Sequence, residues 1–373
     1  AGDRPVEPTL PDRVAPWFTA GTLVVSTLTF TGWYLTGGLE PALRATVAVL
    51  VVACPCALAL AAPLASAAGL GAAARRGVLL RSGDVLRRLA EVKEVALDKT
   101  GTLTGGELEV EEAADADLRI AAALERESIH PVARALVGEA MRRGIPLAEA
   151  QKVQEVAGEG ISGIIGGKRW VLGRGERGGE LSLHADGEIP RRLRLKDRLR
   201  PDAARTVAAL QARGLRVVML SGDHEDVAVQ IGRAAGVDAV VAELRPEGKA
   251  AWLRGRPTLF VGDGLNDGPA LRSAAVGIAM AKGAASSLMI ADGVVVTEAL
   301  APLLAGLRAA EYSRAAVRGN LRRSLVYNVC AVVAAAIGLV NPLVAALLMP
   351  LSSGLVIWGA ARIERQVAKE SAG

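Results

Sequence analysis

The sequence predicts a membrane protein in which four transmembrane α-helices flank a large α/β region. Two observations carry this prediction. Charged residues are absent from the stretches 14–39, 45–74 and 324–361, although they make up 22% of the 373 residues. Between the second and third stretches, short apolar runs alternate with alanine-rich segments. That alternation is typical of a parallel sheet covered by helices.

The uncharged stretches predict four spans, because a membrane-crossing helix needs about 20 mostly apolar residues. The predicted spans are residues 16–36, 45–68, 322–340 and 342–361. Asn341-Pro342 separates the last two, since this dipeptide favours a turn. Arginines gather at the ends next to the α/β region, which predicts that this region lies in the cytoplasm. The alternative is a set of buried core helices in a large soluble domain, but such helices seldom run so long without charge.

Composition excludes several other classes of protein. The chain is 51% hydrophobic, which excludes a disordered tail. Its three cysteines, Cys54, Cys56 and Cys330, are too few for a disulfide framework. The net charge of +5 comes without a basic stripe interleaved with aromatic residues, so no nucleic-acid partner is expected. The predicted non-protein partner is the lipid bilayer.

Within the α/β region, three apolar runs each lead to an aspartate in a glycine-rich turn. They are Glu94–Asp98, Leu215–Leu220 before Asp223, and Thr258–Val261 before Asp263. In open α/β sheets, ligands bind beyond the carboxyl ends of the strands. We therefore expect Asp98, Asp223 and Asp263 to converge, although they are far apart in the sequence.

The strongest local signal is Asp98-Lys99-Thr100-Gly101-Thr102, directly after a predicted strand. A carboxylate in this position can attack phosphorus and form an aspartyl phosphate. The two threonine hydroxyls can donate hydrogen bonds to a phosphoryl group, and Gly101 lets the backbone approach it. The pentapeptide predicts a phosphoryl-transfer site.

This pentapeptide resembles the phosphorylation motif of P-type ATPases, and further family motifs follow in order. They are Asp197 with Arg200-Pro201, Ser221-Gly222-Asp223, Lys249, and Gly262–Asp267 followed by Pro269. The resemblance implies a haloacid dehalogenase-like α/β phosphorylation domain with an inserted α+β nucleotide-binding domain. It implies that the catalytic site comprises Asp98, Lys99, Thr100, Thr102, Ser221, Gly222, Asp223, Lys249, Asp263 and Asp267. It also implies that Asp98, Thr100 and Asp263 hold Mg²⁺, a cation that prefers carboxylate and phosphate oxygens.

Thr100 distinguishes the chain from simple hydrolases of the same superfamily, which usually carry a second aspartate at this place. Without an adjacent base, water is poorly activated and the acyl phosphate survives longer. A persistent phosphoenzyme suits a pump and not a phosphatase.

The inserted domain carries motifs that resemble those of the heavy-metal group of P-type ATPases. Ser128-Ile129-His130-Pro131 resembles Ser-Glu-His-Pro, with isoleucine in place of glutamate. The resemblance implies ATP contacts by Glu125, His130, Pro131, Gly158, Gly160 and Gly173. The expected domains are 1–70 (linker and two spans), 71–106 and 194–318 (phosphorylation domain), 107–193 (nucleotide-binding domain) and 319–373 (two spans and tail).

Cys54-Pro55-Cys56 lies in the middle of the second predicted span. A proline opens the hydrogen-bond ladder of a helix, and two thiolates beside it favour Cu(I), Zn²⁺ or a related soft metal. The motif resembles the ion site of heavy-metal P-type ATPases. Tyr327-Asn328 and Met349-x-x-Ser352-Ser353 resemble signatures of the copper(I) group, although the usual proline after Tyr-Asn is missing. The implied ion ligands are Cys54, Cys56, Tyr327, Asn328, Met349 and Ser353.

These motifs together predict ATP-driven translocation of a soft heavy-metal cation, most favourably Cu(I), through an aspartyl phosphate. Since no Thr-Gly-Glu actuator motif occurs, we expect the chain to be the C-terminal half of a pump. Its expected partners are ATP, Mg²⁺, the metal ion, a copper chaperone and the N-terminal half, in a bacterial plasma membrane. The alternatives are a pump for zinc, cadmium or another transition metal, a membrane-anchored phosphatase, and a catalytically inactive membrane-binding module such as a metal chaperone.

Overall fold

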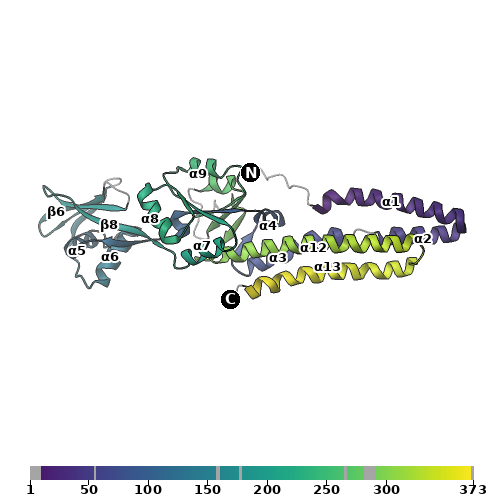
Figure 1. The fold of residues 1–373 in the computed structure, drawn as a ribbon. Coiled ribbons are helices and arrows are strands. Elements are labelled where there is room, and N and C mark those ends of the chain that lie inside the picture. The colour runs from purple at the N-terminus through teal and green to yellow at the C-terminus, as the bar shows by residue number, and fades with distance from the viewer. Residues whose placement is uncertain are drawn as a thin grey trace. The chain divides into compact units, whose positions relative to one another are not determined.

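The structure is a computed structural model that describes residues 10–53, 56–156, 160–175, 179–263, 267–280 and 290–370. The chain divides into two compact units (Figure 1). The helical unit comprises 1–91, 292–296 and 302–373, and the catalytic unit comprises 92–291 and 297–301.

The helical unit is built mainly from five helices. They are α1 (Leu10–Gly37), α2 (Leu39–Val52), α3 (Cys56–Ala74), α12 (Pro302–Ala336) and α13 (Pro342–Glu370). A left-handed glycine, Gly38, separates α1 from α2. The predicted break at Asn341-Pro342 is confirmed, because the Oδ1 atom of Asn341 accepts the Val344 N–H at 2.8 Å where α13 begins.

Small residues let helices α3, α12 and α13 pack side by side (Figure 1). A Cβ atom on Gly69 would lie 2.1 Å from the Oγ atom of Ser313, so α3 and α12 touch closely at this point. Ser313 also donates a hydrogen bond to the Ala65 carbonyl at 3.2 Å. A short antiparallel pair, β1 (Val78–Leu80) with β13 (Gly293–Val295), and helix α4 (Gly83–Leu89) complete the unit.

The prediction of four transmembrane helices is not supported by the structure. Over the residues described, no helix combines the length and the apolar character needed to cross a bilayer. Hydroxyl side chains lower the apolar character of α1. The second predicted span is divided between α2 and α3. Helix α2 has 14 residues, which at 1.5 Å per residue reach about 21 Å against a hydrocarbon core of about 30 Å.

The catalytic unit contains five parallel strands, whose spatial order is β12, β11, β2, β9 and β10. Most of their apolar residues are fully buried, as expected when helices cover both faces of a parallel sheet. The strands are β2 (Glu94–Asp98), β9 (Arg216–Leu220), β10 (Ala239–Val241), β11 (Thr258–Gly262) and β12 (Val276–Met280). The helices are α7 (Ala203–Gln211), α8 (Glu225–Ala235), α9 (Pro246–Leu253) and α10 (Gly268–Ser273).

The same unit contains an antiparallel sheet of six strands, in the order β3-β8-β7-β6-β5-β4. Helices α5 (Asp115–Leu124) and α6 (Pro131–Arg142) pack on it around a core that includes Leu136, Trp170 and Leu193. The strands are β3 (Thr104–Glu112), β4 (Gln151–Val156), β5 (Gly160–Ile165), β6 (Lys168–Arg174), β7 (Glu180–Ala185) and β8 (Arg191–Leu199). Strands β3 and β8 form the two connections of this sheet to the parallel sheet, because the chain enters through one and leaves through the other.

Candidate active site

The carboxyl ends of three neighbouring parallel strands bring the predicted aspartates together. Strand β2 lies between β9 and β11, with Asp98 opposite Leu220 and with Leu97 opposite Val261. Asp223 and Asp263 follow these two flanking strands within a few residues. The convergence expected from the sequence is therefore confirmed. The reason is that parallel strands in register end at one edge of the sheet.

Asp98 is buried at this edge and is held by a lysine. The residue is 5% exposed, and its Oδ1 atom accepts a hydrogen bond from the Nζ atom of Lys249 at 2.5 Å. Burial and the nearby Asp267 carboxylate raise the pKa of Asp98 to about 7, against the opposing effect of Lys249. Any added positive charge at the site would favour the nucleophilic anion of Asp98.

Lys249, in helix α9, joins two carboxylates. Its Nζ atom also donates to the Oδ1 atom of Asp267 at 2.8 Å. Burial disfavours the charged amine, but Asp98 and Asp267 outweigh that effect and raise the pKa of Lys249. Lys249 is thus a fixed positive charge beside the proposed phosphate acceptor.

Lys99, the neighbour of Asp98 in the sequence, has different partners. Its Nζ atom forms ion pairs with Asp197 and, at 2.5 Å, with the Oδ2 atom of Asp223. These carboxylates raise the pKa of Lys99, although burial alone would lower it. Lys99 therefore fixes the loop after β2 to strand β8 and to the turn after β9.

The turn after β9 is ordered by its own serine. The Oγ atom of Ser221, which is 1% exposed, accepts the N–H of Asp223 at 3.1 Å. A Cβ atom on Gly222 would lie 3.3 Å from the Leu244 carbonyl oxygen, which leaves little room for a side chain. The turn thus presents Asp223 to Lys99.

The carboxylates at this edge suit a hard cation. A Cβ atom on Gly101, whose φ is 73°, would lie 2.9 Å from the Oδ2 atom of Asp263, so only glycine leaves room for that carboxylate. The Oδ2 atom of Asp267 is buried and has no hydrogen-bond partner among the described residues. No cluster of three or more His, Cys, Asp or Glu side chains with metal-binding geometry occurs in that part of the chain. Mg²⁺ needs only one or two protein carboxylates beside phosphate and water, so Asp98 and Asp263 fit it.

The two threonines of the motif differ in environment. Thr100 is exposed, whereas Thr102 is fully buried, and the Oγ1 atom of Thr102 has no hydrogen-bond partner among the described residues. A buried hydroxyl without a partner is costly, so Thr102 is ready to donate to a group that arrives at the site.

Two predicted nucleotide-binding glycines meet across strands β5 and β6. A Cβ atom on Gly160, whose φ is 123°, would lie 2.1 Å from the Leu172 carbonyl oxygen and 2.8 Å from the Cα atom of Gly173. The two glycines therefore form one tight contact, which the sequence did not reveal. Gly158 lies outside the described residues.

The predicted ATP contacts Glu125, His130 and Pro131 lie around the start of α6. His130 precedes the helix, and its Nδ1 atom accepts the Val132 N–H at 3.3 Å. Burial raises the pKa of Glu125, while a hydrogen bond from Ser128 opposes the shift. The helix begins at Pro131, which is well suited to a first helical position.

Much of the predicted ion site lies outside the residues that the structure describes. Cys54 and Pro55 lie outside the described residues, as do the side chains of Cys56, Met349, Ser352 and Ser353. Asn328 is 5% exposed on α12, next to the partly buried Tyr327. Two further buried polar residues, Asn320 and Ser324, lie on the same helix at helical spacing, a pattern that the sequence prediction missed.

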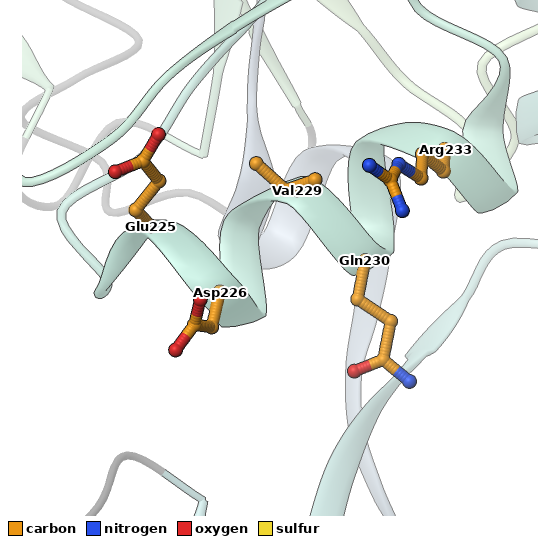
Figure 2. Close-up of a pocket in the computed structure, with 5 residues that line it drawn as sticks. All are labelled: Glu225, Asp226, Val229, Gln230 and Arg233. Carbon is orange, nitrogen blue, oxygen red and sulfur yellow. The ribbon is translucent and has the colours of Figure 1, made fainter.

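One surface hollow in the catalytic unit lies along helix α8 (Figure 2). It is lined by Glu225, Asp226, Val229, Gln230 and Arg233. None of these residues belongs to a predicted motif. The side chains are of both charges and come from one helix, so this hollow carries no functional assignment.

Sequence reasoning gave no role to one buried residue of the site, Arg200. Its guanidinium donates to the carbonyl oxygens of Gly101 at 2.6 Å, of Thr102 at 2.7 Å, and of Glu298. Burial lowers the pKa of Arg200. The only signal in the sequence was the family-like spacing of Asp197 and Arg200, and it did not indicate what the guanidinium binds.

Comparison with known proteins identifies relatives of both units. Residues 92–275 match the haloacid dehalogenase-like hydrolase family. The chain is 34% identical to the copper-exporting P-type ATPase of Mycobacterium tuberculosis, over 95% of this chain and 51% of that protein. It is 35% identical to the probable copper-transporting ATPase PacS of Synechococcus elongatus, over 92% of this chain and 51% of that protein. The chain thus spans about half the length of these curated relatives.

A solved structure resembles nearly the whole chain. The crystal structure of a zinc-transporting PIB-type ATPase in the E2.Pi state matches with a TM-score of 0.87 and 30% identity. The match covers 97% of this chain and 65% of that one. The curated relatives are thus copper pumps, whereas this structural neighbour is a zinc pump.

Proposed function

Because the chain belongs to the heavy-metal P-type ATPases, we propose that it carries the phosphorylation and nucleotide-binding parts of an ATP-driven pump for a soft heavy-metal cation. One observation supports this above all. Asp98 lies buried at the end of β2, has a pKa of about 7, and is bound by Lys249 at 2.5 Å. The fixed positive charge of Lys249 favours the Asp98 anion, which is the form that can attack phosphorus.

The proposed reaction begins with attack by a carboxylate oxygen of Asp98 on the γ-phosphorus of ATP. The new oxygen–phosphorus bond forms as the bond to the β–γ bridging oxygen breaks, and ADP leaves with that electron pair. Water later cleaves the acyl phosphate, releasing phosphate and restoring the Asp98 carboxylate. Lys249 neutralises negative charge throughout, and Thr102 donates a hydroxyl hydrogen bond to the phosphoryl group.

Asp98 and Asp263 would hold Mg²⁺, which would supply positive charge to the transferring phosphoryl oxygens. The carboxylate of Asp267 lies against Gly262, which has no side chain and so leaves room for it. A Cβ atom on Gly262 would lie 2.5 Å from the Oδ2 atom of Asp267. Asp267 therefore orients Lys249, and Lys249 orients Asp98.

A membrane-anchored phosphatase is the main rival on chemical grounds. Thr100 occupies the place where a hydrolase would carry its acid–base aspartate. Asp98 is bonded by Lys249, which also bonds the neighbouring Asp267. Threonine at the place of the acid–base aspartate supports a long-lived intermediate, which a pump can couple to ion movement.

The nucleotide is proposed to bind on the six-stranded sheet. Gly160 and Gly173 form a side-chain-free contact there, which would let the backbone approach the nucleotide closely. Glu125 and His130 would contact the adenine end. Ile129, which is 94% exposed, stands where the heavy-metal group has glutamate and would add an apolar surface.

Cu(I) is the proposed cargo, with Zn²⁺ as the second candidate. The proposed ligands are Cys54, Cys56, Tyr327, Asn328, Met349 and Ser353. A thioether beside two thiolates favours Cu(I) over Zn²⁺. The copper-pump relatives support this choice, and the zinc-transporting structural neighbour keeps the alternative open.

The helical unit is proposed to lie in the membrane domain of a bacterial pump, with the catalytic unit in the cytoplasm. Large apolar side chains on three of its helices are more than half exposed in this structure. They include Leu23, Leu28, Leu35, Val326, Val333, Leu343 and Leu347. A surface of this kind calls for lipid or for further helices to cover it.

Acid-stable labelling with [γ-³²P]ATP tests the proposal. The chain should acquire label on Asp98, and Asp98→Asn should reduce it to background. As a control, Asp226→Asn changes an exposed aspartate of α8 and should leave the label unchanged.

The same assay tests the transported ion. Stimulation of labelling by Cu(I) that Cys54→Ala removes would support copper, whereas stimulation by Zn²⁺ alone would overturn the copper proposal. Label that turns over as fast in Cys54→Ala as in the wild type, without a metal requirement, would favour the phosphatase.

A further inference from the structure

The exposed face of α13 changes from apolar to basic towards its C-terminal end. Leu343 and Leu347 are exposed early in the helix, and Trp358 lies further along the same face and is 50% exposed. Arg362 and Arg365 follow Trp358 at helical spacing, and both are exposed. An apolar face that ends in a tryptophan and then in arginines is typical of a helix that leaves the hydrocarbon region of a bilayer.

The exposed face of α12 changes in the same way. Val333, Val329 and Val326 are more than half exposed and follow one another at helical spacing. Arg322, one turn before Val326, is exposed on the same face. Each of the two helices therefore carries an arginine where its exposed apolar face ends.

The two changes lie at the same level of the helical unit. Helices α12 and α13 are antiparallel, because a short turn joins them and they pack side by side (Figure 1). A Cβ atom on Gly359 would lie 3.0 Å from the Oδ1 atom of Asn320, so these two residues mark one level. At 1.5 Å per residue, Arg322 and Arg362 lie within about 5 Å of this level along their helices. We call Arg322, Arg362 and Arg365 the arginine band.

The positive charges of the arginine band are open to a ligand. Among the described residues, Arg322 and Arg365 form no ion pair with a carboxylate. Glu364, the acidic neighbour of Arg365 on α13, pairs instead with Arg75 of α3 at 2.8 Å. The Cζ atom of Arg362 lies 3.4 Å from the centroid of the Trp358 ring, a contact that holds the guanidinium at the edge of the apolar face.

We propose that the arginine band and Trp358 form a binding site for the phosphate group of an anionic phospholipid in the cytoplasmic leaflet. The inference rests on the proposed function, under which the helical unit lies in a membrane. A guanidinium presents a planar fork of N–H donors that fits phosphate oxygens. The adjoining apolar faces of α12 and α13 fit the acyl chains of the same lipid. A phospholipid matches the order of basic, aromatic and apolar surface, whereas an acidic protein segment matches only the basic part.

Native mass spectrometry of the 373-residue chain in detergent tests this site. The chain is titrated with phosphatidylglycerol or with phosphatidylcholine of the same acyl chains, and the dissociation constant of the first bound lipid is measured. Phosphatidylglycerol should bind at least about tenfold more tightly, because its net charge is negative and that of phosphatidylcholine is zero. Inorganic phosphate at the same concentration should not displace it, because free phosphate lacks the acyl chains.

Three variants make the test specific to the arginine band. Arg362→Gln should weaken phosphatidylglycerol binding about fivefold, the factor that one arginine near an anionic surface contributes, and should leave phosphatidylcholine binding unchanged. Arg362→Gln combined with Arg365→Gln should weaken it about 25-fold. Arg256→Gln is the matched control, because the Cζ atom of Arg256 lies 4.3 Å from the centroid of the Trp252 ring in the catalytic unit. It removes the same charge from the same kind of contact and should leave both affinities unchanged.

The outcomes separate this inference from the proposal on which it rests. A chain that binds neither lipid would overturn the proposed membrane location and the inference with it. Equal affinities for the two lipids would overturn the inference alone, as would unchanged phosphatidylglycerol binding in Arg362→Gln. An equal loss in Arg256→Gln would show a general effect of net charge and would overturn it too. Displacement of the lipid by inorganic phosphate would show a site for free anions and would overturn the lipid assignment.

Discussion

The two units differ in how their buried polar groups are bonded. In the catalytic unit, buried cations are bonded within the site: Lys249 bonds Asp98 and Asp267, and the guanidinium of Arg200 donates to three carbonyl oxygens. In the helical unit, Ser26, Ser324 and the Nδ2 atom of Asn320 are buried without a partner among the described residues. Unpartnered buried atoms also occur in the catalytic site, where the Oδ2 atom of Asp267 and the Oγ1 atom of Thr102 have no partner among the described residues. The units therefore differ in kind: the catalytic site bonds its buried cations to carboxylates and carbonyls, whereas the helices bury neutral polar groups that a metal ion, water or further helices would satisfy.

The comparison extends to the surfaces of the two units. Large apolar side chains are exposed on α1, α12 and α13. The parallel sheet of the catalytic unit, in contrast, buries its apolar residues almost completely, with Phe260, Leu97 and Met219 fully buried. The catalytic unit thus buries its apolar residues and bonds its buried cations, whereas the helical unit leaves large apolar side chains exposed.

The largest expected effect on stability comes from removing Lys249, the cation that Asp98 and Asp267 share. Lys249→Ala leaves Asp98 and Asp267 buried together without a cation, which should lower the free energy of unfolding of the catalytic unit by about 3–5 kcal/mol. Phosphorylation of Asp98 should also be lost. Urea unfolding measures the first effect. Lys168→Ala is the control, because it removes an exposed ion pair with Glu188 and should change the free energy of unfolding little. Equal losses in the two variants would contradict the comparison.

The pH dependence of stability should show the cost of burying Asp98. Its pKa is raised from 3.8 to about 7, so the folded state holds a proton that the unfolded state has released. Its contribution to stability is fully present below pH 4 and is lost as the pH rises through 7, by on the order of 2–4 kcal/mol. Urea unfolding of the wild type and of Asp98→Asn between pH 4 and 8 measures the difference. A difference that does not change with pH would contradict a raised pKa.

A smaller effect is expected at the contact between the two glycines of the six-stranded sheet. Gly160→Ala places a Cβ atom 2.1 Å from the Leu172 carbonyl oxygen at a φ of 123°, which should destabilise the sheet by about 2 kcal/mol and weaken ATP binding. Calorimetry measures the loss of stability and, with added ATP, the affinity for the nucleotide. Gly187→Ala is the matched control, since its φ is also positive but its Cβ atom would meet open space. Identical affinities for ATP in the two variants would remove Gly160 from the proposed nucleotide site.

The smallest effect is expected in the helical unit. Ser324→Ala removes a buried hydroxyl that has no partner in the described part of the chain, so stability should change by less than about 1 kcal/mol, with alanine equal or better. Thermal unfolding in detergent measures this. A larger loss would show that the hydroxyl binds a group in the intact helical unit, and would sharpen the contrast between the units.

The sequence by itself determined the features that short-range patterns encode. Strand runs ending in Asp98, Asp223 and Asp263 predicted a common edge, because parallel strands in register end together. Asn341-Pro342 marked the break between α12 and α13 through turn chemistry. The uncharged stretches predicted helices correctly but overstated their ability to cross a membrane, since absence of charge does not measure the hydroxyl content of α1 or the length of α2.

Only the tertiary structure decided which charged side chains bond one another. Lys249 is 151 residues from Asp98 in the chain and bonds it, whereas the adjacent Lys99 bonds Asp197 and Asp223. The meeting of Gly160 with Gly173 and the bonds from Asp202 to Leu300 and Ala301 likewise depend on strand and loop placement. The physical reason is that local sequence sets backbone preference over a few residues, while pairing of buried charges depends on the register and packing of distant elements.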